Sequence, residues 1–308
     1  MDWKIDPEPD VHPVFPPNVV VQIKALACQL PFDNGIPLSR FSTNDIVAEA
    51  VDRGIVAQIS GSTVWRWLHQ DAIKPWQYRS WIFPRDPQFE QKAGLVLDLY
   101  QRIWQGNTLQ TNEFVISADE KTSIQARRRR HKTLTPIKQY YGKVEHEYKR
   151  MGSLNYIAAW DVHRAKIFGH CEHKSGILAF DSLVSDVMNR EPYASAKRVF
   201  WIVDNGSSHR GQKAIQRLQS KWPKLVLVHL PVHASWLNQI EIFFSILQRK
   251  VLTPNYFDSL SDLADTIIAF EKRYEKIAKP FEWKFTRGDL SKMMKKLGQF
   301  ELHLTKAA

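Results

Sequence analysis

Three acidic residues stand at places where a folded chain could bring them together: Asp119, Asp204 and Glu241. Asp204 follows the apolar run 199–203, and Asp119 follows the shorter apolar run 114–118. Short apolar runs bounded by turn residues are typical of buried strands, so both acids are expected at the edge of a sheet. Carboxylate oxygens are ligands that Mg²⁺ and Mn²⁺ prefer in proteins. The three acids therefore predict a site for Mg²⁺ (or Mn²⁺), with two ions expected.

Such a site serves chemistry on phosphodiesters. Two ions about 3.5–4 Å apart can activate the attacking oxygen and stabilise the leaving oxygen of a displacement. Water or a DNA 3′-hydroxyl is then the nucleophile, so the protein need not supply one. This agrees with the sequence, which contains no convincing Ser/His/Asp arrangement.

Two neighbours of the acids are auxiliary candidates. His209 lies five residues after Asp204, where it could contact the scissile phosphate or a metal-bound water; the alternative is a loop histidine bonded to the backbone. Asn238 lies three residues before Glu241, and helical spacing predicts both on one face. Two more histidines flank the third acid, but no ligand spacing supports a zinc site.

Each acid also has an interpretation without chemistry. Asp119 could occupy a surface turn, Asp204 an Asx turn, and Glu241 an exposed helix face. Glu241, however, stands within the apolar stretch 240–244, where an acid without a partner is costly. The prediction of a catalytic site therefore rests on the joint arrangement and not on any single acid.

The chain is strongly basic, and this favours a polyanionic partner. Its 43 Lys and Arg against 32 Asp and Glu give a net charge of +11 and a pI near 9.5. An anionic membrane is the competing partner, but no basic amphipathic anchor stands out. The densest basic run adjoins the first acid in sequence and is predicted to hold the DNA backbone, the alternative being a solvated basic loop. Its residues are Arg127, Arg128, Arg129, Arg130 and Lys132.

The cysteines, the first residues and the length of the apolar runs together predict the cellular compartment of the protein. Cys28 and Cys171 lie far apart and form no metal-ligand pattern, so they are predicted to be reduced thiols. The first residues lack the features of a signal peptide, and no apolar run is long enough to cross a bilayer. We expect a cytoplasmic protein associated with the nucleoid.

The N-terminal part predicts three helices. The first covers 18–29, the second is opened by Ser42 in a capping box with Asp45, and the third is capped by Ser60. The last two fit a helix-turn-helix, with a plain helical bundle as the alternative. The third helix would face a major groove with the residues predicted to contact DNA: Ser62, Thr63 and Arg66.

The remainder predicts an α/β domain. A linker helix over 87–104 closes the N-terminal region, so we expect a helix-turn-helix region at 1–110 and a catalytic domain at 111–308. Strands and helices then form a mixed sheet flanked by helices, followed by a helical C-terminal stretch from 260 to 304. The predicted strands are 114–118, 123–130, 154–160, 165–170, 199–203 and 225–230, and the helices are 176–190, 211–221 and 236–250.

Three segments carry a family resemblance: 117–125, 201–209 and 233–241. They resemble the catalytic segments of bacterial insertion-sequence DDE transposases of the mariner-like superfamily. The resemblance implies a ribonuclease-H-like catalytic domain that cleaves transposon ends and transfers the 3′-OH strand into target DNA, typically at TA dinucleotides. It also implies double-stranded DNA partners, namely terminal inverted repeats and target DNA, and a homodimer when bound. The implied catalytic and metal-binding triad is Asp119, Asp204 and Glu241.

The chain departs from the family pattern in two respects. Between Asp204 and Glu241 lie 36 residues, slightly more than is usual for mariner-like relatives, and there is room for one clear helix-turn-helix unit where relatives often carry two. Two rival functions remain: a nuclease of the same fold that does not join DNA, and a non-catalytic DNA-binding derivative of a transposase. The intact triad argues against the second.

Overall fold

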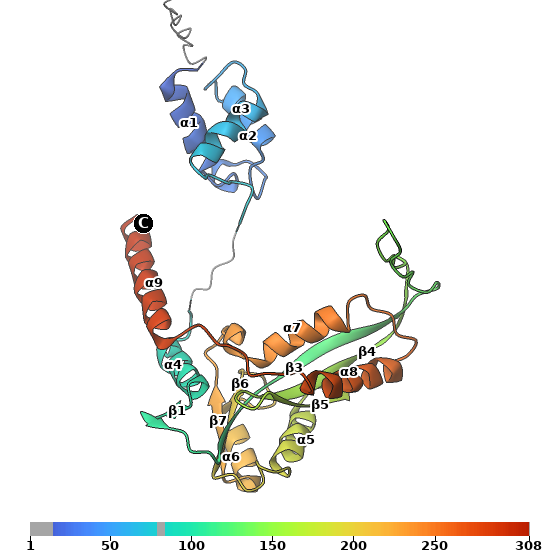
Figure 1. The fold of residues 1–308 in the computed structure, drawn as a ribbon. Coiled ribbons are helices and arrows are strands. Elements are labelled where there is room, and N and C mark those ends of the chain that lie inside the picture. The colour runs from blue at the N-terminus through green and yellow to red at the C-terminus, as the bar shows by residue number, and fades with distance from the viewer. Residues whose placement is uncertain (1–14, 79–83, 308) are drawn as a thin grey trace, which may run out of the picture. The chain divides into compact units, whose positions relative to one another are not determined.

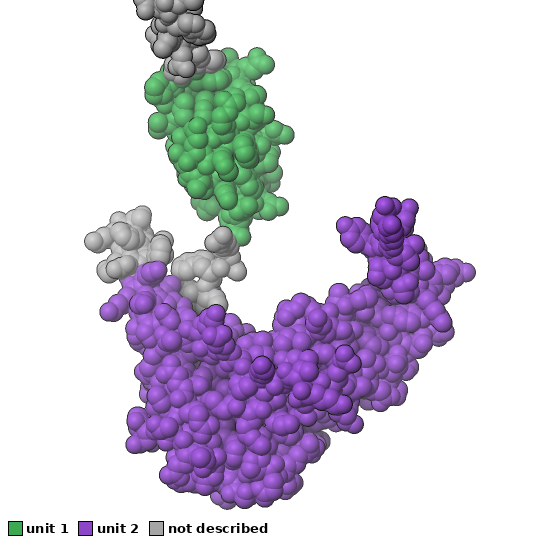
Figure 2. Space-filling model, in the orientation of Figure 1, with its two compact units in different colours: residues 1–82 green, residues 83–308 purple. Residues whose placement is uncertain are grey.

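The structure is a computed structural model that describes residues 15–78 and 84–307, with the side chains of 15–78 and 84–298. The chain divides into two compact units, residues 1–82 and 83–308 (Figure 2). Within the described parts, no helix is both long and apolar enough to span a membrane.

The first unit is helical, as predicted. Ser42 Oγ accepts from the backbone N–H of Asp45 at 3.2 Å, and the Asp45 carboxylate accepts from the Ser42 N–H at 2.7 Å, which completes the predicted capping box. Ser60 caps the third helix by accepting from the Thr63 N–H at 3.2 Å. The helices enclose a small core that includes Ile23, Leu26, Ile46, Val64 and Leu68. The elements are α1 (Pro17–Ala27), η1 (Phe32–Asn34), α2 (Thr43–Asp52) and α3 (Gly61–Gln70).

The second unit is built on a five-stranded mixed sheet with strand order β5-β4-β3-β6-β7. Strands β3, β4 and β5 form an antiparallel meander, and β6 and β7 continue the sheet parallel to β3. This is the ribonuclease-H-like arrangement expected from the sequence. The elements are α4 (Phe89–Tyr100), β1 (Ile103–Trp104), β2 (Asn107–Thr108), β3 (Glu113–Arg128), β4 (Lys149–Asp161), β5 (Lys166–Glu172), α5 (Ile177–Met188), β6 (Arg198–Val203), α6 (Gly211–Lys221), β7 (Leu225–His229), η2 (Ser235–Leu237), α7 (Ile240–Lys250), α8 (Leu260–Glu275) and α9 (Arg287–Ala307).

Helices cover both faces of the sheet (Figure 1). Helices α5 and α6 bury one face around Phe180 and Trp201, and α4, α7 and α8 bury the other around Trp160 and Phe243. The predicted linker helix is α4, and its apolar residues, among them Phe89, lie in the second of these cores. The division between the units therefore falls before α4, earlier than the boundary expected at residue 110.

Strand β3 differs from its prediction. The sequence indicated two strands, 114–118 and 123–130, but residues 113–128 form one strand because β4 pairs with them along almost their whole length. The register shifts between Lys121 and Ile124 and again between Gln125 and Arg127, so the far half of β3 is bulged. The polar residues after Asp119 therefore lie in the sheet and not in a turn.

A half-buried acid on α8, Glu271, predicts how stability depends on pH. The carboxylate of Glu271 accepts from the Tyr156 hydroxyl at 2.8 Å, and burial, together with repulsion from Glu275, raises the pKa of Glu271 to about 7. A raised folded-state pKa gives stability that is fully present below the unfolded value of 4.5 and is lost as the pH rises to about 7.

We expect Glu271→Gln to be more stable than the wild type at pH 8 by roughly 1–3 kcal/mol, with the advantage shrinking toward pH 5. Chemical denaturation at the two pH values measures the effect. The exposed Glu172→Gln serves as the control, and equal pH dependence in wild type and Glu271→Gln contradicts the expectation.

Candidate active site

Two of the three acids are brought together by adjacent parallel strands. The last paired residues of β3 and β6 are Ser117 and Ile202, and each acid lies two residues further on. Asp204 directly follows β6, as predicted. The prediction that Asp119 ends its strand is wrong: it lies inside β3, opposite Ala158 of β4. On the β6 side Asp119 is nevertheless not covered by the sheet, because the pairing of β3 with β6 ends at Ser117.

The third acid, Glu241, is in the first turn of α7 and is exposed. The helix predicted from residue 236 begins at Ile240, because residues 235–237 form a 3₁₀ turn and Asn238 has extended backbone with φ −82° and ψ 112°. The prediction that Asn238 and Glu241 share a helix face is therefore wrong. Asn238 is buried, with 1% of its surface exposed, and Glu241 points to solvent.

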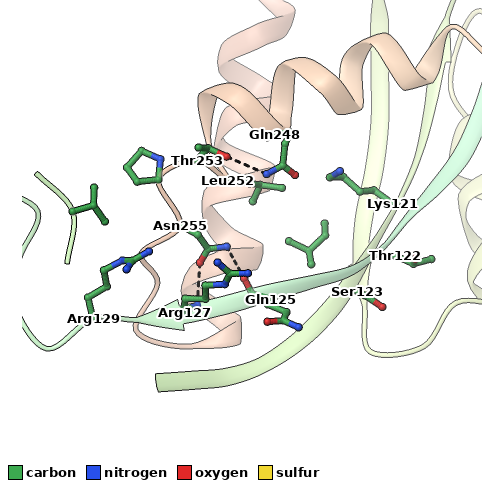
Figure 3. Close-up of a pocket in the computed structure, with 13 residues that line it drawn as sticks. Lys121, Thr122, Ser123, Gln125, Arg127, Arg129, Gln248, Leu252, Thr253 and Asn255 are labelled. Carbon is green, nitrogen blue, oxygen red and sulfur yellow. Dashed lines mark hydrogen bonds between the residues drawn. The ribbon is translucent and has the colours of Figure 1, made fainter. Parts of the chain in front are cut away.

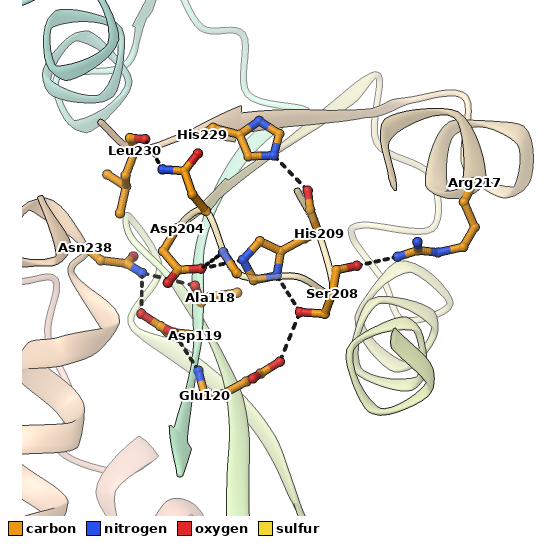
Figure 4. Close-up of polar contacts among 12 residues, drawn as sticks. Ala118, Asp119, Glu120, Asp204, Ser208, His209, Arg217, His229, Leu230 and Asn238 are labelled. Atoms are coloured by element: carbon orange, nitrogen blue, oxygen red, sulfur yellow. Dashed lines mark hydrogen bonds and ion pairs between the residues drawn. The ribbon is translucent and has the colours of Figure 1, made fainter. Parts of the chain in front are cut away.

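Asn238 fastens the start of α7 to β3 (Figure 4). Its amide nitrogen donates to the Asp119 carboxylate and to the Ala118 carbonyl, both at 3.1 Å. The Ser117 hydroxyl donates to the Asn238 side-chain oxygen and accepts from the Ile240 N–H at 2.9 Å. One buried amide thus sets the position of the helix that carries the third acid relative to the first acid.

His209 orients Asp204. Its Nε2 donates to Asp204 Oδ1 at 2.5 Å, and the Gly206 N–H donates to the same oxygen at 2.7 Å. The ring is buried, with 2% exposed, and its Nδ1 lies 2.9 Å from the Ser208 hydroxyl. The structure therefore places His209 behind the carboxylate, as a group that fixes its orientation.

Further residues support this loop, and the sequence patterns did not single them out. The Ser208 hydroxyl donates to Glu120 on β3 at 3.3 Å, and the Arg217 guanidinium donates to the Ser208 carbonyl at 2.7 Å. His229, at the end of β7, donates to the His209 carbonyl at 2.8 Å. These contacts link β3, β7 and α6 to the loop after β6. Ser208 stands in the segment 201–209, so the motif was the only available signal.

The three carboxylates affect one another electrostatically. Burial, together with the charges of Asp204 and Glu241, raises the pKa of Asp119 to about 7, against the lowering effect of hydrogen bonds from Glu120 and Asn238. The pKa of Glu241 is also raised overall, because partial burial and the charge of Asp204 outweigh the lowering effect of the Lys121 charge. The hydrogen bond from His209 keeps the pKa of Asp204 below its usual value. Like charges gathered in this way are costly without a cation nearby.

The donor chemistry of the three acids fits a hard divalent cation, because every side chain offers carboxylate oxygen. Their spacing is not that of a closed metal site: among residues 15–78 and 84–298, no group of three or more His, Cys, Asp or Glu is arranged to hold a metal ion. Asp204 Oδ1 is already bonded to His209 and Gly206, which leaves Oδ2 as its freer oxygen.

The residues of the predicted basic run fall into two groups in the structure, those that contact other side chains or carbonyls and those that are exposed. The Arg127 guanidinium lies 4.6 Å from the centre of the Tyr148 ring, Arg128 is 3.4 Å from Asp258, and Arg129 donates to the Glu145 carbonyl. Arg130 and Lys132 are exposed in the segment between β3 and β4. Three of the five cations, Arg127, Arg128 and Arg129, are thus engaged with other residues of the unit.

Only some of the residues of α3 that were predicted to contact DNA are exposed. Ser62 and Arg66 are exposed, but the Thr63 hydroxyl is 2.9 Å from that of Ser60 in the helix cap. An aromatic pair that was not expected lies on the exposed side of α3: Trp65, with 49% of its surface exposed, is stacked on His69 at 4.8 Å between ring centroids. Its spacing of four residues was the signal that could have revealed it.

One family model matches the part of the chain that contains the three acids. Residues 115–264 match the family model of the DDE superfamily endonucleases, and this segment contains all three acids. This segment of the chain is similar to those endonucleases.

Solved transposase structures share the fold. The mariner Mos1 paired-end complex with Mn has a TM-score of 0.52 at 14% identity, covering 96% of this chain and 81% of that chain. The Mos1 strand transfer complex has a TM-score of 0.52 at 13% identity, covering 94% and 79%. The paired-end complex with Mg has a TM-score of 0.51 at 13% identity, covering 97% and 82%. No curated protein matches the sequence significantly.

Proposed function

We propose that this protein is a DNA transposase that cleaves transposon ends and transfers the 3′-OH strand into target DNA. The observation that carries the proposal is the gathering of Asp119, Asp204 and Glu241 at one sheet edge, where their charges raise the pKa of Asp119. Phosphodiester chemistry without a protein nucleophile needs such a cluster of oxygen ligands.

In this proposal the three acids hold Mg²⁺ or Mn²⁺, two ions in the complete site. The bound ions would activate the attacking oxygen and stabilise the leaving oxygen. His209 holds the Asp204 carboxylate in one orientation, and Asn238 holds Asp119 beside the first turn of α7. Relatives of the same fold are described as complexes with Mn and with Mg, which supports this choice of metal.

Double-stranded DNA is the proposed partner, as terminal repeats and as target. The region 1–110 would recognise the ends, with α3 as the helix of a helix-turn-helix that faces the major groove. Exposed Ser62 and Arg66 would contact the DNA, together with Arg127, Arg130 and Lys132 of the second unit. Relatives described as paired-end and strand transfer complexes support a homodimer on two DNA ends.

A strand-transfer assay tests the proposal. Full-length protein is incubated with Mg²⁺, a supercoiled target and pre-cleaved duplexes that carry the terminal sequence it selects from a random pool. We expect covalent joining of the 3′-hydroxyl to target, and loss of joining when a 3′-deoxy end is supplied. Hydrolysis of DNA without joined product would instead identify a nuclease, and binding without either product a non-catalytic derivative.

A further inference from the structure

A cavity of about 540 Å³ lies between the far half of β3 and the end of α7 (Figure 3). It begins at Lys121, two residues beyond Asp119, and extends along β3 to Arg127 and Arg129. Its volume is within the range of pockets that hold small ligands, roughly 300–1,000 Å³. Three cations line the cavity and no acid does, so it favours an anionic ligand.

Three polar atoms of residues that line this cavity have no partner among the described residues. They are the side-chain oxygen of Gln125, which accepts hydrogen bonds, and the Nε atoms of Arg127 and Arg129, which donate them; all three are shielded from solvent. A buried polar group without a partner costs about 1–3 kcal/mol, so these atoms are disposed to bind a ligand. A ligand that satisfies the Gln125 oxygen and an arginine Nε must carry both a donor and an acceptor.

The cavity wall is held in shape independently of any ligand. The Asn255 side chain accepts from the Arg127 N–H at 3.0 Å and donates to the Gln125 carbonyl at 2.7 Å, across the bulge of β3. The Gln248 side chain donates to the Thr253 hydroxyl at 3.1 Å and closes the other side. The backbones of Gln125 and Arg127 are therefore held by Asn255, and the Arg127 guanidinium, which lies over the Tyr148 ring, still has its Nε without a hydrogen-bond partner among the described residues.

We propose that this cavity is a subsite for one nucleotide of the DNA strand, separate from the scissile position. Arg127 would bind its phosphate, and the Gln125 oxygen would accept from an N–H on its base. The proposal rests on DNA being the substrate, and it gives Gln125 a binding role.

The subsite lies at a defined distance from the acids. Arg127 is eight residues beyond Asp119 on β3, which at a strand rise of about 3.3 Å per residue is roughly 26 Å. DNA rises about 3.4 Å per nucleotide along one strand, so the bound phosphate is expected about five to nine nucleotides from the scissile bond.

Neutralising single phosphates tests the subsite. Methylphosphonates are placed one at a time along a duplex that the full-length protein selects from a random pool, and affinity is measured for each. In the wild type we expect a loss of roughly 5- to 30-fold at one phosphate in that interval. Arg127→Ala should bind the unmodified duplex more weakly by a similar factor and lose nothing further at that phosphate. The control, Arg190→Ala just after α5, should keep the wild-type profile.

An abasic site at the same nucleotide tests Gln125. It should weaken binding by the wild type but not by Gln125→Ala, and thermal unfolding shows whether both variants remain folded. Arg127→Lys keeps the positive charge, so its affinity should fall on methylphosphonate substitution at that phosphate, by less than in the wild type but by more than in Arg127→Ala.

The subsite is overturned if Arg127→Ala, correctly folded, shows the wild-type methylphosphonate profile, or if Arg190→Ala abolishes the loss as well. A wild-type protein that cleaves and joins DNA but shows no such phosphate overturns the subsite alone. A wild-type protein that neither binds nor cleaves DNA overturns the proposed function as well.

Discussion

Asp204→Asn is expected to reduce metal-dependent DNA cleavage by about a thousand-fold or more, because groups that act together in a catalytic unit lose most of their effect when one is removed. The change keeps the size of the side chain, and the amide oxygen can still accept from Gly206 and His209. What it removes is the negative charge that would hold a divalent cation. Folding and binding of a duplex should therefore be nearly unchanged.

Single-turnover cleavage and a binding assay on the same duplex measure the two effects separately. Asp186→Asn is a matched control, because Asp186 is an exposed acid on α5 that pairs with Arg190. Cleavage by Asp204→Asn at the wild-type rate would contradict the site. Equal losses of cleavage and binding would also contradict it, since they would place Asp204 in DNA binding and not in chemistry.

Asn238→Ala is expected to have the second largest effect, on both stability and activity. It removes the donor to Asp119 and Ala118 and leaves the buried Ser117 hydroxyl without its acceptor. Leaving buried polar groups unpaired costs about 1–3 kcal/mol each, so we expect a loss of roughly 2–4 kcal/mol in the free energy of unfolding. Cleavage should fall by about 10- to 100-fold, because a loosened α7 misplaces Glu241 relative to Asp119.

A control separates the two effects of Asn238→Ala. Tyr193→Phe removes a buried hydroxyl that donates to Asp161 at 2.7 Å and makes no hydrogen bond with the three acids, so it should lower stability with little effect on cleavage. Denaturant unfolding and single-turnover cleavage at several Mn²⁺ concentrations are measured on both variants. Higher Mn²⁺ should partly rescue Asn238→Ala. Equal cleavage by the two variants would show that Asn238 has no positioning role.

The fold could be predicted from the sequence where the signals are local. Ser42 and Ser60 cap the helices that they were expected to cap, because capping depends on residues three positions apart. The extent of β3 depended on a distant partner: only pairing with β4 keeps the polar residues 119–123 in a strand. Tertiary contacts were also needed to assign α4 to the second unit, because the apolar pattern of an amphipathic helix does not indicate which core it packs against.

The three acids of the candidate site could be predicted from the sequence, but the way in which their neighbours position them could not. Apolar runs and motif residues identified Asp119, Asp204 and Glu241, and the structure brings their charges close enough to interact. The role of Asn238 was not predictable from helical spacing, because the helix begins two residues after it and leaves the side chain free to turn inward. The cavity on β3 depends on the bulge at Gln125 and Arg127, which no local pattern indicated.

The central claim is that the three carboxylates together bind divalent cations for phosphodiester chemistry. A titration of the full-length protein with Mn²⁺, followed by electron paramagnetic resonance of the free ion, tests it most directly. We predict saturable binding by the wild type and clearly weaker binding by each of Asp119→Asn, Asp204→Asn and Glu241→Gln, with Asp186→Asn unchanged. Wild-type affinity in all three variants, or no saturable binding by the wild type, would contradict the claim.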